Sequence, residues 1–228
     1  ARRLVSVTAM RCSTVMHRTC CLLLVLLLAA PVTAGELRAR VVSDKGEPVA
    51  DAVVYARPLA ASPLEPGVME AVIDQVDKEF VPALTVVSAG AEVRFPNNDN
   101  IRHHVYSFSE GNAFEIPLYA DREAPPVTFA NPGVVALGCN VHDWMSAYVF
   151  VADTPFFGVT DSAGEVVMES LPAGEYTVEL WHARLRGKPE ALRQNVVVGD
   201  APSRLDFTIK QRRVWKAWRG SSDFEEGY

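Results

Sequence analysis

The chain has 228 residues, of which 22 are basic and 28 acidic, so its formal net charge is −6. An acidic balance argues against nucleic acid as a partner, because such sites concentrate lysine and arginine. The length allows one large or two small domains.

Residues 1–34 have the features of an export signal. Arg11 and Arg18 precede an apolar run at residues 20–30, and Ala34 closes a stretch of small residues that a signal peptidase accepts. The run is shorter than the roughly 20 residues that a membrane-spanning helix needs. We therefore expect cleavage after Ala34 and a periplasmic or secreted protein with no transmembrane segment in the mature chain.

Removal of this signal changes both the charge and the cysteine content. It takes away four arginines and no acidic residue, so 18 basic and 28 acidic residues remain and the net charge becomes −10. Redox partners with a basic docking face would suit this charge. Three of the four cysteines also leave, and Cys139 stays without a disulfide partner. A metal-bound thiolate would protect this thiol in an oxidising compartment.

Cys139 begins a segment, residues 139–145 (CNVHDWM), that also contains His142 and Met145, and His103 lies 36 residues upstream. A thiolate, two imidazoles and a weak axial thioether describe the blue-copper electron-transfer centre. The sequence therefore predicts one type 1 copper ion, with His103, Cys139 and His142 as equatorial ligands and Met145 as the axial ligand. We expect His103 at the end of an upstream strand.

Other interpretations of these residues stay open. Cys139 alone is also compatible with a small buried hydrophobe, and Met145 alone with a core residue. Zinc is the rival metal, although structural zinc sites use closed Cys/His sets without a thioether. No carboxylate pair or nucleophile triad is evident, so we expect no enzyme activity.

The rest of the chain predicts an all-β fold. Short runs rich in β-branched residues alternate with Gly, Pro, Asn and Asp, as in sandwiches and barrels. Predicted strands in the middle of the chain cover residues 69–76, 83–87, 92–95, 104–108, 127–129, 134–137 and 147–151.

Two half-motifs flank this middle region. Residues 44–53 (DKGEPVADAV) and residues 160–176, which contain TDSAG and LPAGEY, resemble the two halves of carboxypeptidase-regulatory-like and transthyretin-like small β-sandwiches. The resemblance implies one sandwich, residues 35–62 plus 154–210, that is split by an inserted domain at residues 63–153, with a C-terminal tail at residues 211–228. Insertions are tolerated where the ends of a domain lie close together. A single long sandwich is the alternative.

The middle region resembles the cupredoxins. Residues 93–98 (VRFPNN) look like the strand that enters the first copper ligand. Residues 97–105 (NNDNIRHHV) are similar to the plastocyanin segment that ends in His-Asn-Val or His-Asn-Ile, whose histidine is that ligand. The spacing of residues 139–145 is that of amicyanins. The resemblance implies a Greek-key cupredoxin-like sandwich and selects His103 over His104. Proteins of this composite type are often called methylamine utilization proteins.

Two neighbours of the ligands depart from the plastocyanin pattern. His104 stands where plastocyanins place an asparagine that braces the ligand loop, and Asn140 follows the cysteine. We hypothesise that His104 and Asn140 together replace this brace and orient the ligands. Single-electron transfer is the predicted function. A copper carrier or homeostasis protein, and a non-redox interaction module stabilised by metal, are the alternatives.

Overall fold

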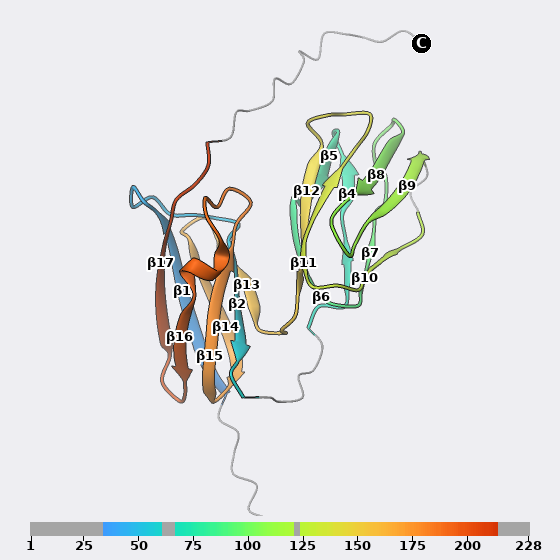
Figure 1. Cartoon of the computed structure of the whole chain (residues 1–228). Helices are drawn as coiled ribbons and strands as arrows, with labels where there is room; N and C mark the ends of the chain where they lie inside the picture. Colours follow the sequence, from blue (N-terminus) through green and yellow to red (C-terminus); the bar gives the residue numbers. More distant parts are fainter. Residues whose placement is uncertain (1–33, 61–66, 121–123, 214–228) are drawn as a thin grey trace, which may run out of the picture. The chain divides into compact units, whose positions relative to one another are not determined.

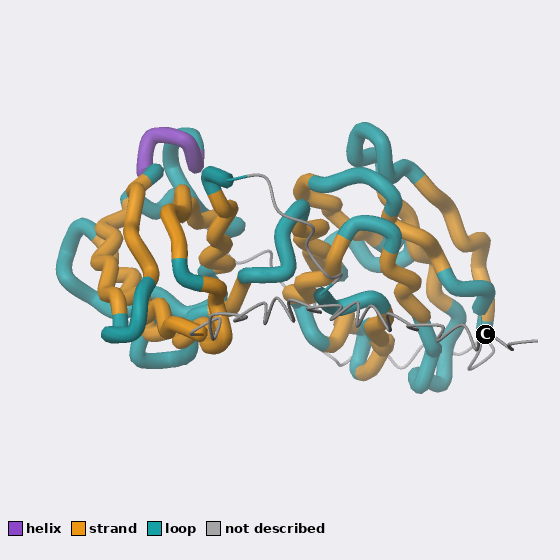
Figure 2. The backbone as a smooth tube through the Cα atoms, turned by 90° about the horizontal axis from the view of Figure 1, so that it is seen from below, coloured by secondary structure: helices purple, strands orange, loops and turns teal. Residues whose placement is uncertain are grey.

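The structure is a computed structural model that describes residues 34–60, 67–120 and 124–213 (Figure 1). Its regular elements are strands apart from one short 3-10 helix, η1 (Pro189–Leu192), as Figure 2 shows. The predicted all-β fold class is confirmed. The predicted signal segment, except Ala34, and residues 214–228 of the predicted tail lie outside the described residues. Within the described ranges, no helix has the length and apolar character to cross a membrane.

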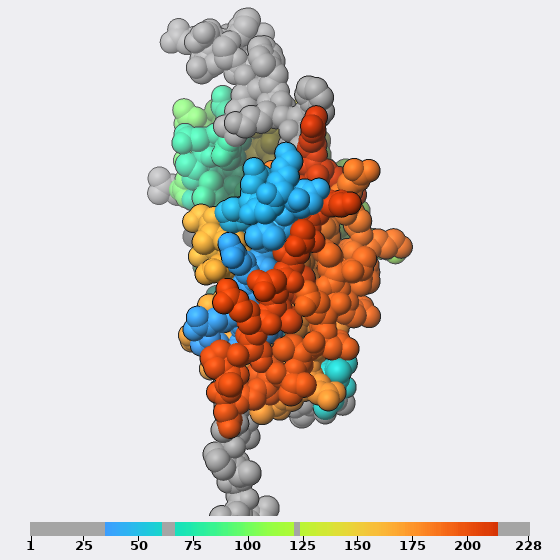
Figure 3. All heavy atoms as spheres, turned by 90° about the vertical axis from the view of Figure 1, so that its left-hand side faces the viewer, coloured from blue at the N-terminus to red at the C-terminus, as the bar shows by residue number. Residues whose placement is uncertain are grey.

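One sandwich combines strands from both ends of the described chain. Its sheets have the strand orders β14–β1–β17 and β13–β2–β15–β16. β1 and β17 run parallel to each other, and Figure 3 shows blue residues of the β1 region beside red residues of the β17 region. The strands are β1 (Ala34–Ser43), β2 (Val53–Pro58), β13 (Phe157–Val159), β14 (Glu165–Pro172), β15 (Gly174–Trp181), β16 (Gln194–Val198) and β17 (Ser203–Ile209).

The hydrophobic core of this sandwich follows from the two-residue period of its strands. In β1, Leu37, Ala39 and Val41 are buried, whereas Arg38 and Arg40 between them are exposed. Successive side chains of a strand point to opposite faces, so this alternation gives β1 one apolar face. That face packs in a cluster with apolar residues of both sheets.

A charged network lies on β15 of the same sandwich. The Glu179 carboxylate accepts hydrogen bonds from the Tyr55 hydroxyl (3.0 Å), Arg57 Nη1 (2.6 Å) and Arg193 Nε (2.6 Å). Its side chain is only 4% exposed. Burial alone would raise the pKa of this carboxyl, but the hydrogen bonds from Arg57, Arg193 and Tyr55 outweigh burial, so the pKa lies below its ordinary value.

Glu179→Gln removes the charge that faces two arginines and is expected to lower the free energy of unfolding by about 3 kcal/mol. Urea denaturation measures this change, and Glu175→Gln, at an exposed position of the same strand, is the matched control. Ionised Glu179 stabilises the fold above the ordinary glutamate pKa of about 4.3, and this stabilisation is lost as pH falls through the lower folded value. The variant should therefore lose less stability in acid than the wild type; equal losses would contradict the assignment.

The second group of strands forms the sheets β10–β7–β3 and β6–β12–β11–β8–β9, together with the hairpin β4–β5. Apolar residues from both sheets share one core, and Cys139 and Met145 belong to it. The strands are β3 (Glu70–Val72), β4 (Asp74–Val76), β5 (Glu79–Val81), β6 (Leu84–Ser88), β7 (Ala91–Arg94), β8 (His103–Ser107), β9 (Phe114–Tyr119), β10 (Val127–Phe129), β11 (Gly133–Gly138) and β12 (Ser146–Ala152).

The structure differs from the predicted strands at three places. The strand predicted at residues 69–76 is two strands, because β3 pairs in parallel with β7 whereas β4 turns to pair with β5. Neither β5 nor β9 was predicted. β9 contains Pro117 and lies at the edge of its sheet, which is where a strand tolerates proline.

The sheets separate β1, β2 and β13 to β17 from β3 to β12. A strand of the first group, β2, is therefore followed along the chain by ten strands of the second before the first group resumes at β13. The division into domains at residues 35–62 plus 154–210 and at residues 63–153 stays a prediction.

Candidate metal centre

The loop between β11 and β12 consists of residues 139–145, the predicted ligand segment. Gly138, the last residue of β11, pairs with Ser146, the first residue of β12, so the two strands close the loop at its base. Inside the loop the Met145 amide donates a hydrogen bond to the His142 carbonyl (3.0 Å). Because the loop is short and closed, Cys139, His142 and Met145 are confined to one end of the sheet.

His103 comes from a different strand. It is the first residue of β8, which is the neighbour of β11 in the sheet. Its Nδ1 lies 3.8 Å from Cys139 Sγ, and His142 Nδ1 lies 3.9 Å from the same sulfur. The donor atoms of the three residues all lie within 4.8 Å of one another. Residues far apart in the sequence thus meet at one point.

All four predicted ligands are buried. His103 is 0% exposed, Met145 2%, Cys139 4% and His142 7%. Burial lowers the pKa of His142, and the nearby His103 and Lys78 lower it further. At neutral pH this imidazole is therefore uncharged, which is the form that binds a metal ion.

The residues that meet here fit a copper ion. One thiol and two imidazole nitrogens form a mixed soft and borderline donor set, which suits copper. Among the residues that the structure describes, His103, Cys139 and His142 form the single group of three metal-binding side chains. Met145 belongs to the same hydrophobic core cluster as Cys139, and its role as the axial ligand stays a prediction.

His104 and Asn140, the two residues of the hypothesised brace, have separate surroundings. His104 Nε2 lies 2.8 Å from Glu115 Oε1 on β9. Its Nδ1 is buried and, within the described ranges, has no hydrogen-bond partner. Asn140 is exposed, and no hydrogen bond joins it to His104 in the described part of the chain. The bracing role of both residues stays a prediction.

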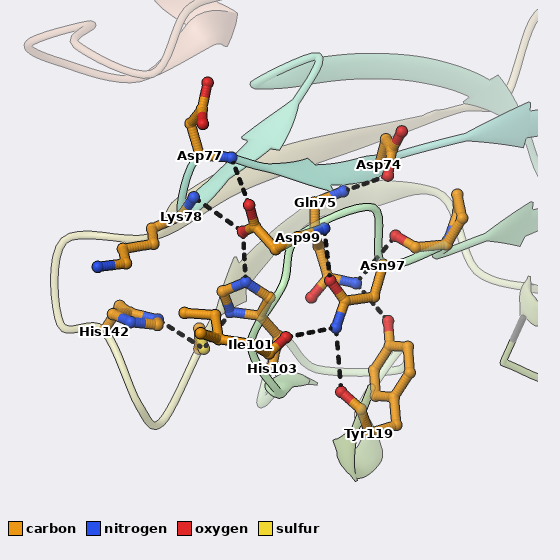
Figure 4. A network of polar contacts seen from close by, with 12 residues as sticks. Asp74, Gln75, Asp77, Lys78, Asn97, Asp99, Ile101, His103, Tyr119 and His142 are labelled. Carbon is orange, nitrogen blue, oxygen red and sulfur yellow. Dashed lines mark hydrogen bonds and ion pairs between the residues drawn. The ribbon is translucent and has the colours of Figure 1, made fainter. Parts of the chain in front are cut away.

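A residue that sequence reasoning did not assign to the site contacts His103 directly. Asp99 Oδ2 lies 2.6 Å from His103 Nε2 (Figure 4). The same carboxylate accepts hydrogen bonds from the backbone amides of Asp77 (2.7 Å) and Lys78 (2.9 Å). Burial raises the pKa of Asp99, but the hydrogen bonds from Lys78, His103 and Asp77 outweigh it, so the pKa is lower than usual. The Asp-x3-His spacing is the only sequence signal for this contact.

Asn97 fixes the segment that leads from Asp99 to His103. It is 1% exposed, and its side-chain amide donates hydrogen bonds to the carbonyls of Ile101 (2.9 Å) and Tyr119 (3.1 Å). Its side-chain oxygen accepts a hydrogen bond from the Asp99 amide (3.0 Å). Figure 4 shows these bonds on the side of His103 away from His142.

No protein-family model and no curated protein matches the chain. Among solved structures, a Cu-containing nitrite reductase from Thermus scotoductus SA-01 is similar over 42% of this chain, with 25% identity and a TM-score of 0.35. The chain covers only 25% of that enzyme.

Two smaller proteins are similar over nearly their whole length. A purple cupredoxin from Nitrosopumilus maritimus is 20% identical over 36% of this chain and 99% of its own, with a TM-score of 0.32. A reduced Cu(I) form of an amicyanin mutant is 22% identical over 43% of this chain and 99% of its own, with a TM-score of 0.34. Each of these likenesses concerns less than half of the present chain.

Asn97→Ala leaves two carbonyls and one amide without their partner and is expected to lower the free energy of unfolding by about 2 to 3 kcal/mol. Asn100→Ala, at an exposed position of the same segment, is the control and should change stability by less. Urea denaturation of both variants checks the difference. Equal stability of the two variants would show that the Asn97 side chain does not hold this segment.

Proposed function

We propose that the chain is an exported type 1 copper protein of the cupredoxin kind that transfers single electrons in the periplasm. The observation that supports this most directly is the convergence of Cys139 Sγ with the Nδ1 atoms of His103 and His142 in a buried place. A copper ion held there would supply one-electron redox chemistry. His103, Cys139 and His142 would hold the ion, with Met145 as a fourth, weaker ligand.

The packing of the donors suits electron transfer. His103 extends from a strand, Cys139 follows the last residue of another, and both are buried. Side chains in a close-packed interior have little room to move. The ligands would therefore keep a similar arrangement in both oxidation states, which keeps the reorganisation that accompanies each electron transfer small.

His142 is the proposed point of electron entry and exit. It lies on the loop, its ring centroid is 5.2 Å from that of Trp144, and the side chains of Val141 and Trp144 beside it are exposed. An apolar contact surface next to His142 would let a redox partner approach closely. The acidic mature chain, with a net charge of −10, favours a partner with a basic docking face.

We propose an electron carrier rather than an enzyme or a copper carrier. A copper carrier has to pass the ion to another protein by exchanging ligands one at a time, which requires accessible donor atoms. Here His103 is 0% exposed and Cys139 4%. Burial of the donors therefore favours a resident ion over a transported one.

The copper-loaded protein is expected to show an intense visible absorption band from thiolate-to-copper charge transfer. Cys139→Ser should abolish this band because an alcohol cannot replace the thiolate. Ser146→Ala, at the exposed residue that follows the loop, should keep it. Metal analysis and absorption spectroscopy of the three proteins test this. A colourless wild-type protein with one copper ion per chain would contradict the type 1 site.

Copper exchange separates the electron carrier from the copper carrier. Because the donors are buried, transfer of copper from the loaded protein to an excess of a chelator should be slow, whereas electron self-exchange between oxidised and reduced protein should be fast. Stopped-flow absorption follows the first process and NMR line broadening the second. Fast copper loss combined with slow self-exchange would favour transport of copper.

A further inference from the structure

We propose that Asp99 is a positioning residue for His103, and that the turn of the β4–β5 hairpin holds Asp99 in place. This inference rests on the proposed function. A carboxylate and a hairpin outside the ligand loop would thus orient one ring nitrogen of His103 toward the metal.

The two ring nitrogens of His103 have different partners. Nε2 lies 2.6 Å from Asp99 Oδ2, and Nδ1 lies 3.8 Å from Cys139 Sγ. An ionised carboxylate can only accept a hydrogen bond, so Nε2 carries the hydrogen. In the neutral ring, Nδ1 then keeps its free lone pair directed toward Cys139. Asp99 thus selects the tautomer that a metal ion at this place requires.

Asp99 is itself held by the chain. Its two carboxylate oxygens accept hydrogen bonds from the amides of Asp77 and Lys78, and its own amide donates to Asn97. Because both oxygens are held by backbone amides, the carboxylate has little freedom to turn away from His103. Its side chain is only 11% exposed, so water competes weakly for these bonds.

The hairpin turn has the backbone that this contact needs. Val76 pairs with Glu79, so Asp77 and Lys78 form a two-residue turn between β4 and β5. Their φ angles are 52° and 61°, in the left-handed region that residues other than glycine rarely adopt. Left-handed φ at both central positions is typical of the type I′ turn, whose twist matches that of the flanking strands. In this turn both backbone amides point at Asp99 (Figure 4).

The neighbouring pair of His104 and Glu115 provides an internal comparison. It has the same chemistry, with His104 Nε2 2.8 Å from Glu115 Oε1. However, the Glu115 side chain is 66% exposed, and His104 is not part of the group of three metal-binding side chains. A carboxylate-to-imidazole contact next to the site but outside it is therefore available as a matched control.

The test compares Asp99→Asn with Glu115→Gln, two substitutions that remove a carboxylate charge with little change of shape. In the metal-free wild type, long-range ¹H–¹⁵N NMR spectra should show His103 with its hydrogen on Nε2. Asp99→Asn should give a mixture of tautomers because an amide can donate as well as accept. Glu115→Gln should leave the His103 signals unchanged.

The second readout uses copper. Loss of a carboxylate behind a histidine ligand costs about 10- to 100-fold in metal affinity, so Asp99→Asn should bind Cu(II) more weakly by this factor. Its reduction potential should rise, because a less basic imidazole stabilises Cu(II) less. Glu115→Gln should stay within about twofold of the wild type in affinity. A role of Asp99 in folding alone would move the unfolding midpoint without changing tautomer or potential.

Three outcomes would overturn the assignment. One is a metal-free wild type with the His103 hydrogen on Nδ1, which needs no variant and so does not depend on the folding of Asp99→Asn. Another is an Asp99→Asn protein with unchanged tautomer and copper affinity. The last is an equal effect of Glu115→Gln. A wild type that binds no copper would contradict the proposed function, whereas the NMR comparison in the metal-free protein would still decide the role of Asp99.

Discussion

Burial of polar donor atoms in an apolar core is the constraint on which this structure depends. A thiol and two imidazoles are buried in the second group of strands, β3 to β12, whose core is apolar and where unpaired polar groups are costly. The free energy that this burial costs is limited at His103 by the bond to Asp99, and at His142 by its uncharged form. The Cys139 sulfur and the Nδ1 atoms of His103 and His142 then face one another, and a metal ion would bind all three.

The order of the strands in the β-sheet brings the three donor residues together. β8 and β11 are antiparallel neighbours, so the first residues of β8 lie beside the last residues of β11 although they are distant in the chain. His103 begins β8 and Cys139 follows the end of β11, which places both residues at the same end of the sheet. The short connection to β12 then keeps His142 beside them.

The ligand loop could be predicted from the sequence because its residues are neighbours in the chain. The spacing of Cys139, His142 and Met145 within one loop is local, and His103 was selected by resemblance to a known segment. Asp99 could not be assigned in the same way. The position of its carboxylate depends on hydrogen bonds from the amides of Asp77 and Lys78, which lie 22 and 21 residues away in the chain. Only the packing of the β4–β5 hairpin brings these amides to Asp99. The sequence alone predicted neither strand β5 nor the turn before it.

His103 and His104 have different surroundings although they are adjacent in the chain. Successive residues of β8 point to opposite faces, so one imidazole enters the core and the other lies on the outer side with Glu115. Each meets a carboxylate, yet the consequence depends on the second nitrogen of the ring. In His103 that nitrogen faces a sulfur and another imidazole, whereas in His104 it is buried and, among the described residues, without a partner. A histidine next to a carboxylate is therefore a ligand candidate only when its other nitrogen points at further donors.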